Sequence, residues 1–289
     1  MSDWPKAPTA WIEDRQLFVS VPFTWNLYNV RASVSQASFL WDHATVGGPA
    51  IRLARIFEAP FEWPDGVNVD YGDIPGVLNR VNPIATRTSV GCPNSCGFCG
   101  VSTIEPQFSE LAQWDTKPIV CDNNFLACSS EHRAEVYARL ETLNCLAGIV
   151  DFNQGLDAYL LTTWDAERLS KLKANCRLAC DTASSLGIVK DAVVLLRSAK
   201  NALKRIFVYA LIGWKDSPFD AWKRCIEIES LGVYCCPMWF HELDAMYWNK
   251  VTEKQKALGW DHEKRKHIMG YFWQHRGQPP LGNVDGRRK

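Results

Sequence analysis

The sequence predicts an α/β fold in which parallel strands alternate with helices. Short apolar runs rich in β-branched residues recur along residues 85–240, and segments with helical periodicity separate most of them. The chain has 289 residues, of which 47% are hydrophobic, enough to build a large core. Because parallel strands need long, right-handed crossovers, we expect a parallel α/β layer or an incomplete barrel.

Each element of this prediction has its own signal in the sequence. Six strands are expected, at residues 85–90, 118–121, 148–152, 177–180, 205–212 and 233–240. Ser217 followed by Pro218 and Asp220 is typical of a helix start, and Gly232 is typical of a helix end. Between the fourth and fifth strands, one helical stripe is apolar: Val189, Ala192, Val193, Leu196 and Ala199.

Polar residues follow the predicted strands directly. The carboxyl ends of parallel strands meet at one edge of a sheet, so we expect these side chains to gather on one face of the fold. They include Asp122, Asn123 and Asn124 after the second strand, Asn153, Gln154 and Asp157 after the third, and Asp181, Thr182 and Ser184 after the fourth.

Charge and hydropathy narrow the classes of function. The formal net charge is zero, which argues against a protein that binds nucleic acid or an anionic membrane through an overall basic field. No apolar run has the length of a signal peptide or a membrane span, so we expect a cytoplasmic protein without membrane association.

The end of the chain is basic and aromatic. Residues 250–289 carry 10 basic and 4 acidic side chains. The aromatic residues Trp260, Tyr271, Phe272 and Trp273 lie among the basic residues Lys264, Arg265, Lys266 and Arg276. This combination is compatible with base stacking and phosphate contacts on a nucleic acid. A solvated helix with its aromatic residues in the core explains the same pattern, and we favour that interpretation.

The chain contains 11 cysteines, an odd number that argues against a disulfide framework and for reduced thiols. Eight of them show no Cys-x2-Cys pairing, and we expect those to be buried core residues: Cys121, Cys128, Cys145, Cys176, Cys180, Cys225, Cys235 and Cys236. The other three, Cys92, Cys96 and Cys99, fall within the stretch GCPNSCGFCG at residues 91–100.

Three closely spaced cysteines suit an iron–sulfur cluster better than a structural zinc site. Structural zinc normally takes four protein ligands, and no second cysteine pair lies nearby to complete such a set. A cluster of four irons held by three thiolates keeps one iron open for a substrate or cofactor. The neighbouring Gly91, Pro93, Gly97 and Gly100 suit a tight loop whose backbone amides face the cluster sulfurs.

This stretch resembles the hallmark of the radical S-adenosylmethionine (SAM) enzymes, in which Cys-x3-Cys-x2-Cys carries an aromatic residue before the last cysteine. Cys92, Cys96, Phe98 and Cys99 match it, after the first strand of the six-strand pattern. The resemblance covers about residues 83–240 and implies a partial (β/α)6 TIM-like barrel. It also implies a 4Fe–4S cluster on Cys92, Cys96 and Cys99. That cluster would cleave SAM reductively to a 5′-deoxyadenosyl radical that abstracts a substrate hydrogen.

The resemblance extends to residues expected to bind SAM. Residues 120–125 look like the segment that meets the SAM amino group, with Asp122, Asn123 and Asn124 where many members have Gly-Gly-Glu. Gln154 and Asp181 occupy strand ends whose polar contacts, in the family, reach the SAM carboxylate and ribose. Ile212 and Gly213 match the segment that packs on adenine.

The flanking segments complete the expected domain organisation. Residues 1–82 are expected to form a short α/β cap, similar to a shortened cobalamin-binding region. The cobalamin signature is absent because Asp42 and His43 are adjacent, so no cobalamin is expected. Residues 83–240 form the expected barrel, and residues 241–289 form a helical extension that opens with His241, Glu242 and Asp244. His241 is the candidate acid or base at the mouth of the barrel. A helix cap and surface charge would explain Glu242 and Asp244 equally well.

Two alternatives to a radical SAM enzyme stay open from the sequence: a zinc-dependent nucleic-acid-binding module, and a non-catalytic iron–sulfur barrel. The resemblance implies an electron donor such as flavodoxin or ferredoxin as a partner. The substrate is unknown, and the basic aromatic tail favours a nucleic acid or nucleotide.

Overall fold

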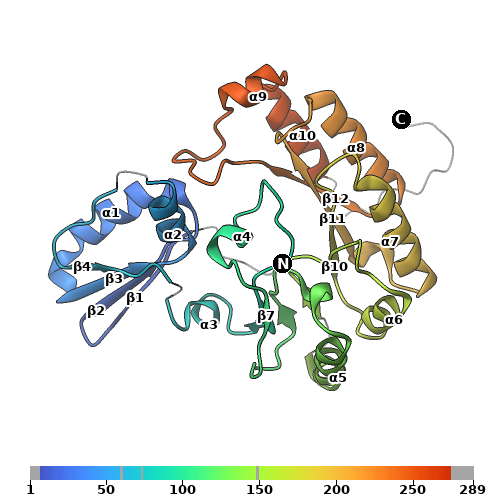
Figure 1. Ribbon diagram of the computed structural model, residues 1–289, viewed down its shortest axis with the longest axis horizontal. Coiled ribbons are helices and arrows are strands. Elements are labelled where there is room, and N and C mark those ends of the chain that lie inside the picture. The colour runs from blue at the N-terminus through green and yellow to red at the C-terminus, as the bar shows by residue number, and fades with distance from the viewer. Residues whose placement is uncertain (1–6, 59–60, 73, 148–149, 275–289) are drawn as a thin grey trace. The chain divides into compact units, whose positions relative to one another are not determined.

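The computed structural model describes residues 7–58, 61–72, 74–147 and 150–274, without the side chains of residues 144–147. The chain divides into two compact units (Figure 1). The first contains residues 1–85, 94–106 and 241–249, and the second contains residues 86–93, 107–240 and 250–289. The two units are described separately below.

The first unit is an α/β layer built on a four-stranded sheet, β1 (Thr9–Glu13), β2 (Gln16–Ser20), β3 (His43–Gly47) and β4 (Val67–Val69). β1 and β2 form an antiparallel hairpin, whereas β2, β3 and β4 are parallel. Its helices are α1 (Leu27–Gln36), α2 (Pro49–Ile56), α3 (Val77–Val81) and α4 (Val101–Ile104). Apolar residues of α1 and α2 pack with those of β2 and β3 to form its core. The α/β character predicted for the N-terminal region is confirmed.

The six predicted strands follow one another in chain order, and all of them except Ala85, the first residue of β5, belong to the second unit. β5 (Ala85–Thr86), β8 (Ile119–Val120) and β9 (Asp151–Phe152) form one sheet, and β10 (Cys176–Ala179), β11 (Ile206–Ile212) and β12 (Tyr234–Trp239) form another. The pairs β8–β9, β10–β11 and β11–β12 are parallel, as predicted. Two isolated parallel bridges, Asp151 with Asn175 and Leu156 with Leu178, lie between the two sheets. The described strands form no closed barrel.

The first predicted strand differs from expectation because it is interrupted. After β5 the chain continues into β6 (Ser89–Val90), which pairs antiparallel with β7 (Ser109–Glu110). At the break, the backbone amides of Thr88 and Ser89 donate to the carboxylate of Asp122. A side chain therefore replaces strand pairing at this point.

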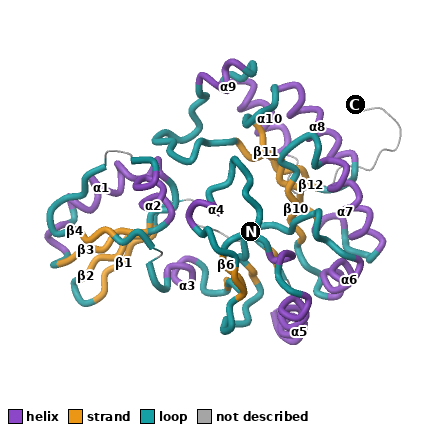
Figure 2. Tube along the Cα trace, in the orientation of Figure 1, coloured by secondary structure: helices purple, strands orange, loops and turns teal. Residues whose placement is uncertain are grey.

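Helices separate the strands, as Figure 2 shows. They are α5 (Ser130–Ala147), α6 (Thr163–Lys171), α7 (Leu186–Ser198) and α8 (Pro218–Ser230). Two more helices, α9 (Glu253–Ala257) and α10 (His262–Gln274), follow the last strand. The predicted start of α8 is confirmed, because the Ser217 hydroxyl accepts a hydrogen bond from the Asp220 amide at 3.2 Å. The predicted stripe of α7 is also confirmed: Val189, Ala192, Val193 and Leu196 are buried.

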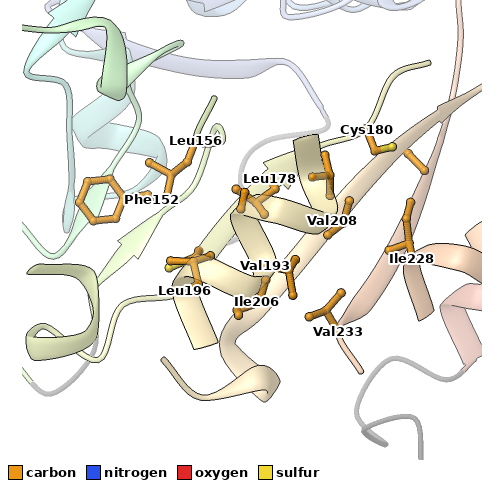
Figure 3. Packing of buried hydrophobic residues seen from close by; sticks show 14 of the residues in the cluster. Phe152, Leu156, Leu178, Cys180, Val193, Leu196, Ile206, Val208, Ile228 and Val233 are labelled. Atoms are coloured by element: carbon orange, nitrogen blue, oxygen red, sulfur yellow. The ribbon is translucent and has the colours of Figure 1, made fainter. Parts of the chain in front are cut away.

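The two faces of the β10–β11–β12 sheet differ. Side chains of β11 alternate between fully buried and half-buried positions. The buried set, which includes Ile206 and Val208, packs with Val193 of α7 and Ile228 of α8 (Figure 3). The half-buried set, Phe207, Tyr209 and Leu211, belongs to the opposite face, which we call the open face. By register, Met238 lies beside Leu211 on that face and is 45% exposed.

Burial settles two further predictions. Seven of the eight scattered cysteines are buried, as predicted, and the side chain of Cys145 lies outside the described residues. Burial raises the pKa of Cys128 and Cys176 to about 12, which keeps both as thiols. In the basic C-terminal segment, Trp260 and Phe272 are core residues, so the interpretation of core aromatics is confirmed for them.

Among the described residues, no helix combines the length and apolar character needed to cross a bilayer.

Candidate functional site

The cysteine loop at residues 91–100 begins where β6 ends. Gly91 has φ +73°, a left-handed conformation that glycine adopts without strain. Cys92, Cys96 and Cys99 are half-buried and none is in a disulfide. Cys92 belongs to the second unit, whereas Cys96, Phe98 and Cys99 belong to the first, where the Cys99 amide donates to the Cys96 carbonyl at 2.9 Å. In the described part of the chain, no three His, Cys, Asp or Glu side chains are gathered so that they could hold a metal ion.

Asp122, predicted to contact SAM, faces the backbone that leads into this loop. One carboxylate oxygen accepts from the amides of Thr88 and Ser89 at 2.6 and 3.0 Å. The other oxygen accepts from the Thr88 hydroxyl at 2.5 Å, and that hydroxyl lies 3.1 Å from Nε2 of His132. The side chain is 2% exposed. In this structure Asp122 therefore anchors the chain just before Cys92.

Asn124 is the predicted SAM contact with the most informative surroundings. Its Nδ2 donates to Sγ of Cys92 at 3.7 Å and to a carboxylate oxygen of Asp157 at 3.2 Å. Its Oδ1 is buried and has no hydrogen-bond partner. A buried acceptor without a donor costs free energy, about 1–3 kcal/mol, and such a group marks a place where a ligand can supply the missing hydrogen.

Two further polar side chains, the carboxylates of Asp157 and Asp181, lie at the ends of the next two strands. Asp157 follows β9 and Asp181 follows β10, close enough that the charge of Asp157 raises the pKa of Asp181. Burial is the larger cause, and although Arg224 opposes the shift, the pKa of Asp181 rises to about 6. We call Cys92, Asn124, Asp157 and Asp181 the strand-end cluster. The other two predicted residues here are less enclosed, since Asn123 is half-buried and Gln154 is exposed.

Ile212 and Gly213, the predicted adenine contacts, are held inside the fold. The Ile212 side chain is fully buried in the core on the helix side of the sheet. Gly213 has φ +83°, and the nearest neighbour of a Cβ added there would be a ring carbon of Trp239, only 2.5 Å away. Its amide donates to Asp216 at 2.8 Å, and its carbonyl accepts from Gln255 at 3.0 Å. The Ile212 side chain is thus a core group.

His241, the predicted acid or base, has a structural contact in the first unit. Its Nε2 accepts a hydrogen bond from the Asn249 amide at 3.0 Å, which closes the loop at residues 241–249. Its ring lies 4.7 Å from that of Trp25. The Thr24 hydroxyl holds the same loop by donating to the Ala245 carbonyl at 2.6 Å. Nε2 of His241 is therefore already engaged as an acceptor that closes this loop, so a structural contact occupies the atom predicted to transfer a proton.

Sequence reasoning missed one buried network on the open face. Arg177 of β10 makes two hydrogen bonds to the carboxylate of Asp151, at 2.8 and 2.6 Å, and a third to the Tyr209 hydroxyl at 2.8 Å. The signal for it was present in the sequence, because an arginine and an aspartate each interrupt an apolar strand. Strand pairing brings them together across neighbouring strands.

In their chemistry, the residue types of the loop and the strand-end cluster fit the iron–sulfur cluster and SAM implied by the resemblance, although the structure, over the residues it describes, does not gather the three cysteine side chains into a metal-binding group. Thiolates are the usual ligands of iron–sulfur clusters, and hydrogen bonds to their sulfurs tune them. The loop provides three cysteines outside disulfides, and an amide N–H group already points at one sulfur. The unpartnered Oδ1 of Asn124 and the neighbouring carboxylates suit a ligand that carries an ammonium group.

Comparison with known proteins adds no family to this description: no protein-family model matches the chain, and no curated protein matches it.

Proposed function

We propose that this chain is a radical SAM enzyme in which Cys92, Cys96 and Cys99 hold a 4Fe–4S cluster. The spacing of the three cysteines, with Phe98 before the last, supports the proposal from the sequence. The structural observation that carries it is the environment of Asn124. Its amide donates to the Cys92 sulfur at 3.7 Å, while its buried Oδ1 is left without a donor.

The order of the strands supports a partial (β/α)6 barrel for the second unit. β5, β8 and β9 are neighbours in one sheet and β10, β11 and β12 in the other, both in chain order. The two parallel bridges between them join the series between β9 and β10. In such a fold the reacting groups act from the carboxyl ends of the strands, where Asn124, Asp157 and Asp181 are found.

In this proposal the strand-end cluster binds and orients the cationic part of SAM. When held by Cys92, Cys96 and Cys99, a reduced cluster would supply the electron for cleavage of the sulfur–C5′ bond of SAM, giving methionine and a 5′-deoxyadenosyl radical. Oδ1 of Asn124 accepts a hydrogen bond from the ligand ammonium group, and the carboxylate of Asp181 compensates its charge. A neighbouring cation stabilises an ionised carboxylate, so ligand binding lowers the raised pKa of Asp181.

Three other residues shape the surroundings of the proposed site: Asp122, Leu211 and Met238. Asp122 fixes the backbone before Cys92, and Leu211 with Met238 give the open face an apolar surface that excludes water near the strand ends. The chain itself carries no other redox group in this proposal, so an electron donor such as flavodoxin or ferredoxin is the proposed partner. A reducing compartment such as the cytoplasm suits the reduced thiols. The proposed substrate class, a nucleic acid or nucleotide, is supported only by the basic side chains of the C-terminal segment, because Trp260 and Phe272 are core residues.

The test is reconstitution with iron and sulfide under anaerobic conditions, followed by SAM and dithionite. We expect 5′-deoxyadenosine and methionine in equal amounts, and incorporation of substrate deuterium into deoxyadenosine. Cys96→Ser should abolish both products. Cys225→Ala, which changes a buried cysteine of α8, should retain them. A protein that binds iron and sulfide without SAM cleavage would identify a non-catalytic iron–sulfur barrel. One zinc per chain without sulfide would favour the zinc-dependent alternative.

A further inference from the structure

Among the described residues of the second unit three arginines are buried, and one of them differs from the others in its surroundings. Arg177 pairs with Asp151, and Arg224 pairs with Asp216 at 2.8 Å. Arg265 of α10 is 7% exposed, and no carboxylate among the described residues forms an ion pair with it. Burying an arginine without a counter-charge is strongly unfavourable, because the lost hydration of the guanidinium is not compensated. An uncompensated buried charge of this kind suggests that a ligand supplies the counter-charge.

The contacts that Arg265 does make are weak ones. An NH2 group lies 3.4 Å from Nδ1 of His262, and the guanidinium carbon lies 5.8 Å from the ring centre of Trp239. Its Nε is buried and has no hydrogen-bond partner. Burial lowers the pKa of Arg265, with no opposing effect from a nearby acid. The guanidinium still keeps its charge at neutral pH, because arginine is effectively always protonated.

Trp239 adds a second unsatisfied donor. It is the last residue of β12, and its Nε1 is buried without a partner. By contrast, the Nε1 of its neighbour Trp260 donates to the Asp216 carbonyl at 2.8 Å. The Trp239 ring is held in place by an edge contact with Trp260 at 5.0 Å and by the close approach of Gly213.

We propose that Arg265 and Trp239 form a binding site for an oxyanion group, a phosphate or a carboxylate, at the carboxyl end of β12. A guanidinium recognises such groups through charge-assisted, often bidentate hydrogen bonds, and an indole N–H adds a neutral donor. The anion supplies the counter-charge that the described residues lack. The site does not depend on the cluster or on SAM, so it can be tested in the purified chain without metal.

The experiment compares the full chain in chloride, phosphate and acetate at one ionic strength and neutral pH, by thermal unfolding and by titration calorimetry. Phosphate or acetate should raise the melting temperature of the unchanged protein in a concentration-dependent way. The anion that binds more tightly identifies the source, a phosphate or a carboxylate ligand. Trp239→Phe, which loses one neutral hydrogen bond of about 1 kcal/mol, should weaken binding about fivefold.

Changes at Arg265 distinguish a ligand site from a structural role. Arg265→Met should lose the response to both anions and, in chloride, should melt at or above the temperature of the unchanged protein, because it removes an uncompensated buried charge. Arg265→Lys should bind more weakly than arginine but still respond. Lys266→Gln, an equal change of charge at an exposed position of α10, should keep binding within about twofold. An unchanged melting temperature of the original protein in both anions overturns the proposal. So does an Arg265→Met variant that melts lower in chloride.

Discussion

The close approach of Gly213 to Trp239 gives a prediction whose size follows from the structure. In Gly213→Ala, the new Cβ would lie 2.5, 2.8 and 2.9 Å from three carbons of the Trp239 ring. The ring cannot retreat freely, because Trp260 packs against it. Overpacking of this kind costs about 1–3 kcal/mol. The φ of +83° adds about 1–2 kcal/mol for a residue with a side chain. We expect Gly213→Ala to lower the free energy of unfolding by about 2–5 kcal/mol.

Urea unfolding followed by circular dichroism measures this loss. The matched control is Gly187→Ala near the start of α7, where a Cβ would meet no atom within 4 Å and φ is not positive. That change should raise stability by up to about 1 kcal/mol, because alanine favours helix. If Gly213→Ala unfolds within about 0.5 kcal/mol of the unchanged protein, the end of β11 does not pack on Trp239 as described.

Three further outcomes follow from carboxylates that are buried or half-buried: those of Asp181, Asp165 and Asp122. The pKa of Asp181, raised to about 6 from about 3.9 in the unfolded chain, means that the native state loses stability as the pH rises from 4 to 7. Asp181→Asn should therefore match the unchanged protein at pH 4 and exceed it by about 2–3 kcal/mol at pH 7 in thermal or urea unfolding. Asp165, fully buried, accepts from Arg133 at 2.6 Å and completes the capping box of α6 by accepting from the amide of the N-cap residue Thr162, so Asp165→Ala should cost about 3–5 kcal/mol in the same assay. A loss below about 1 kcal/mol would contradict that pairing. Asp122→Ala should expose the backbone before Cys92, seen as faster amide hydrogen exchange at Ser89, and unchanged exchange would refute its anchoring role.

The strands of the second unit were predictable because their composition and spacing are local properties. Apolar β-branched runs locate β8, β9, β10, β11 and β12, and the cap at Ser217 locates the start of α8. The division of the first strand was not predictable, since it depends on the Asp122 carboxylate, which approaches Thr88 from 34 residues further along the chain.

The site was predictable at the level of residue type and less so at the level of contacts. The position of Asn124 at a strand end follows from the sequence, but its bonds to Cys92 and Asp157 require the neighbouring strands to be in place. Arg265 was expected on a solvated helix face and is buried, because α10 packs that face on β12. A charge pattern alone does not reveal which side of a helix faces the sheet.

The most direct measurement of the central claim is electron paramagnetic resonance of the anaerobically reconstituted, dithionite-reduced protein before and after SAM is added. The account predicts about four irons and four sulfides per chain and a reduced-cluster signal that changes when SAM binds. It also predicts that Asn124→Leu weakens this change while Cys225→Ala leaves it intact. A chain that takes up no iron and sulfide, or a cluster signal indifferent to SAM, would contradict it.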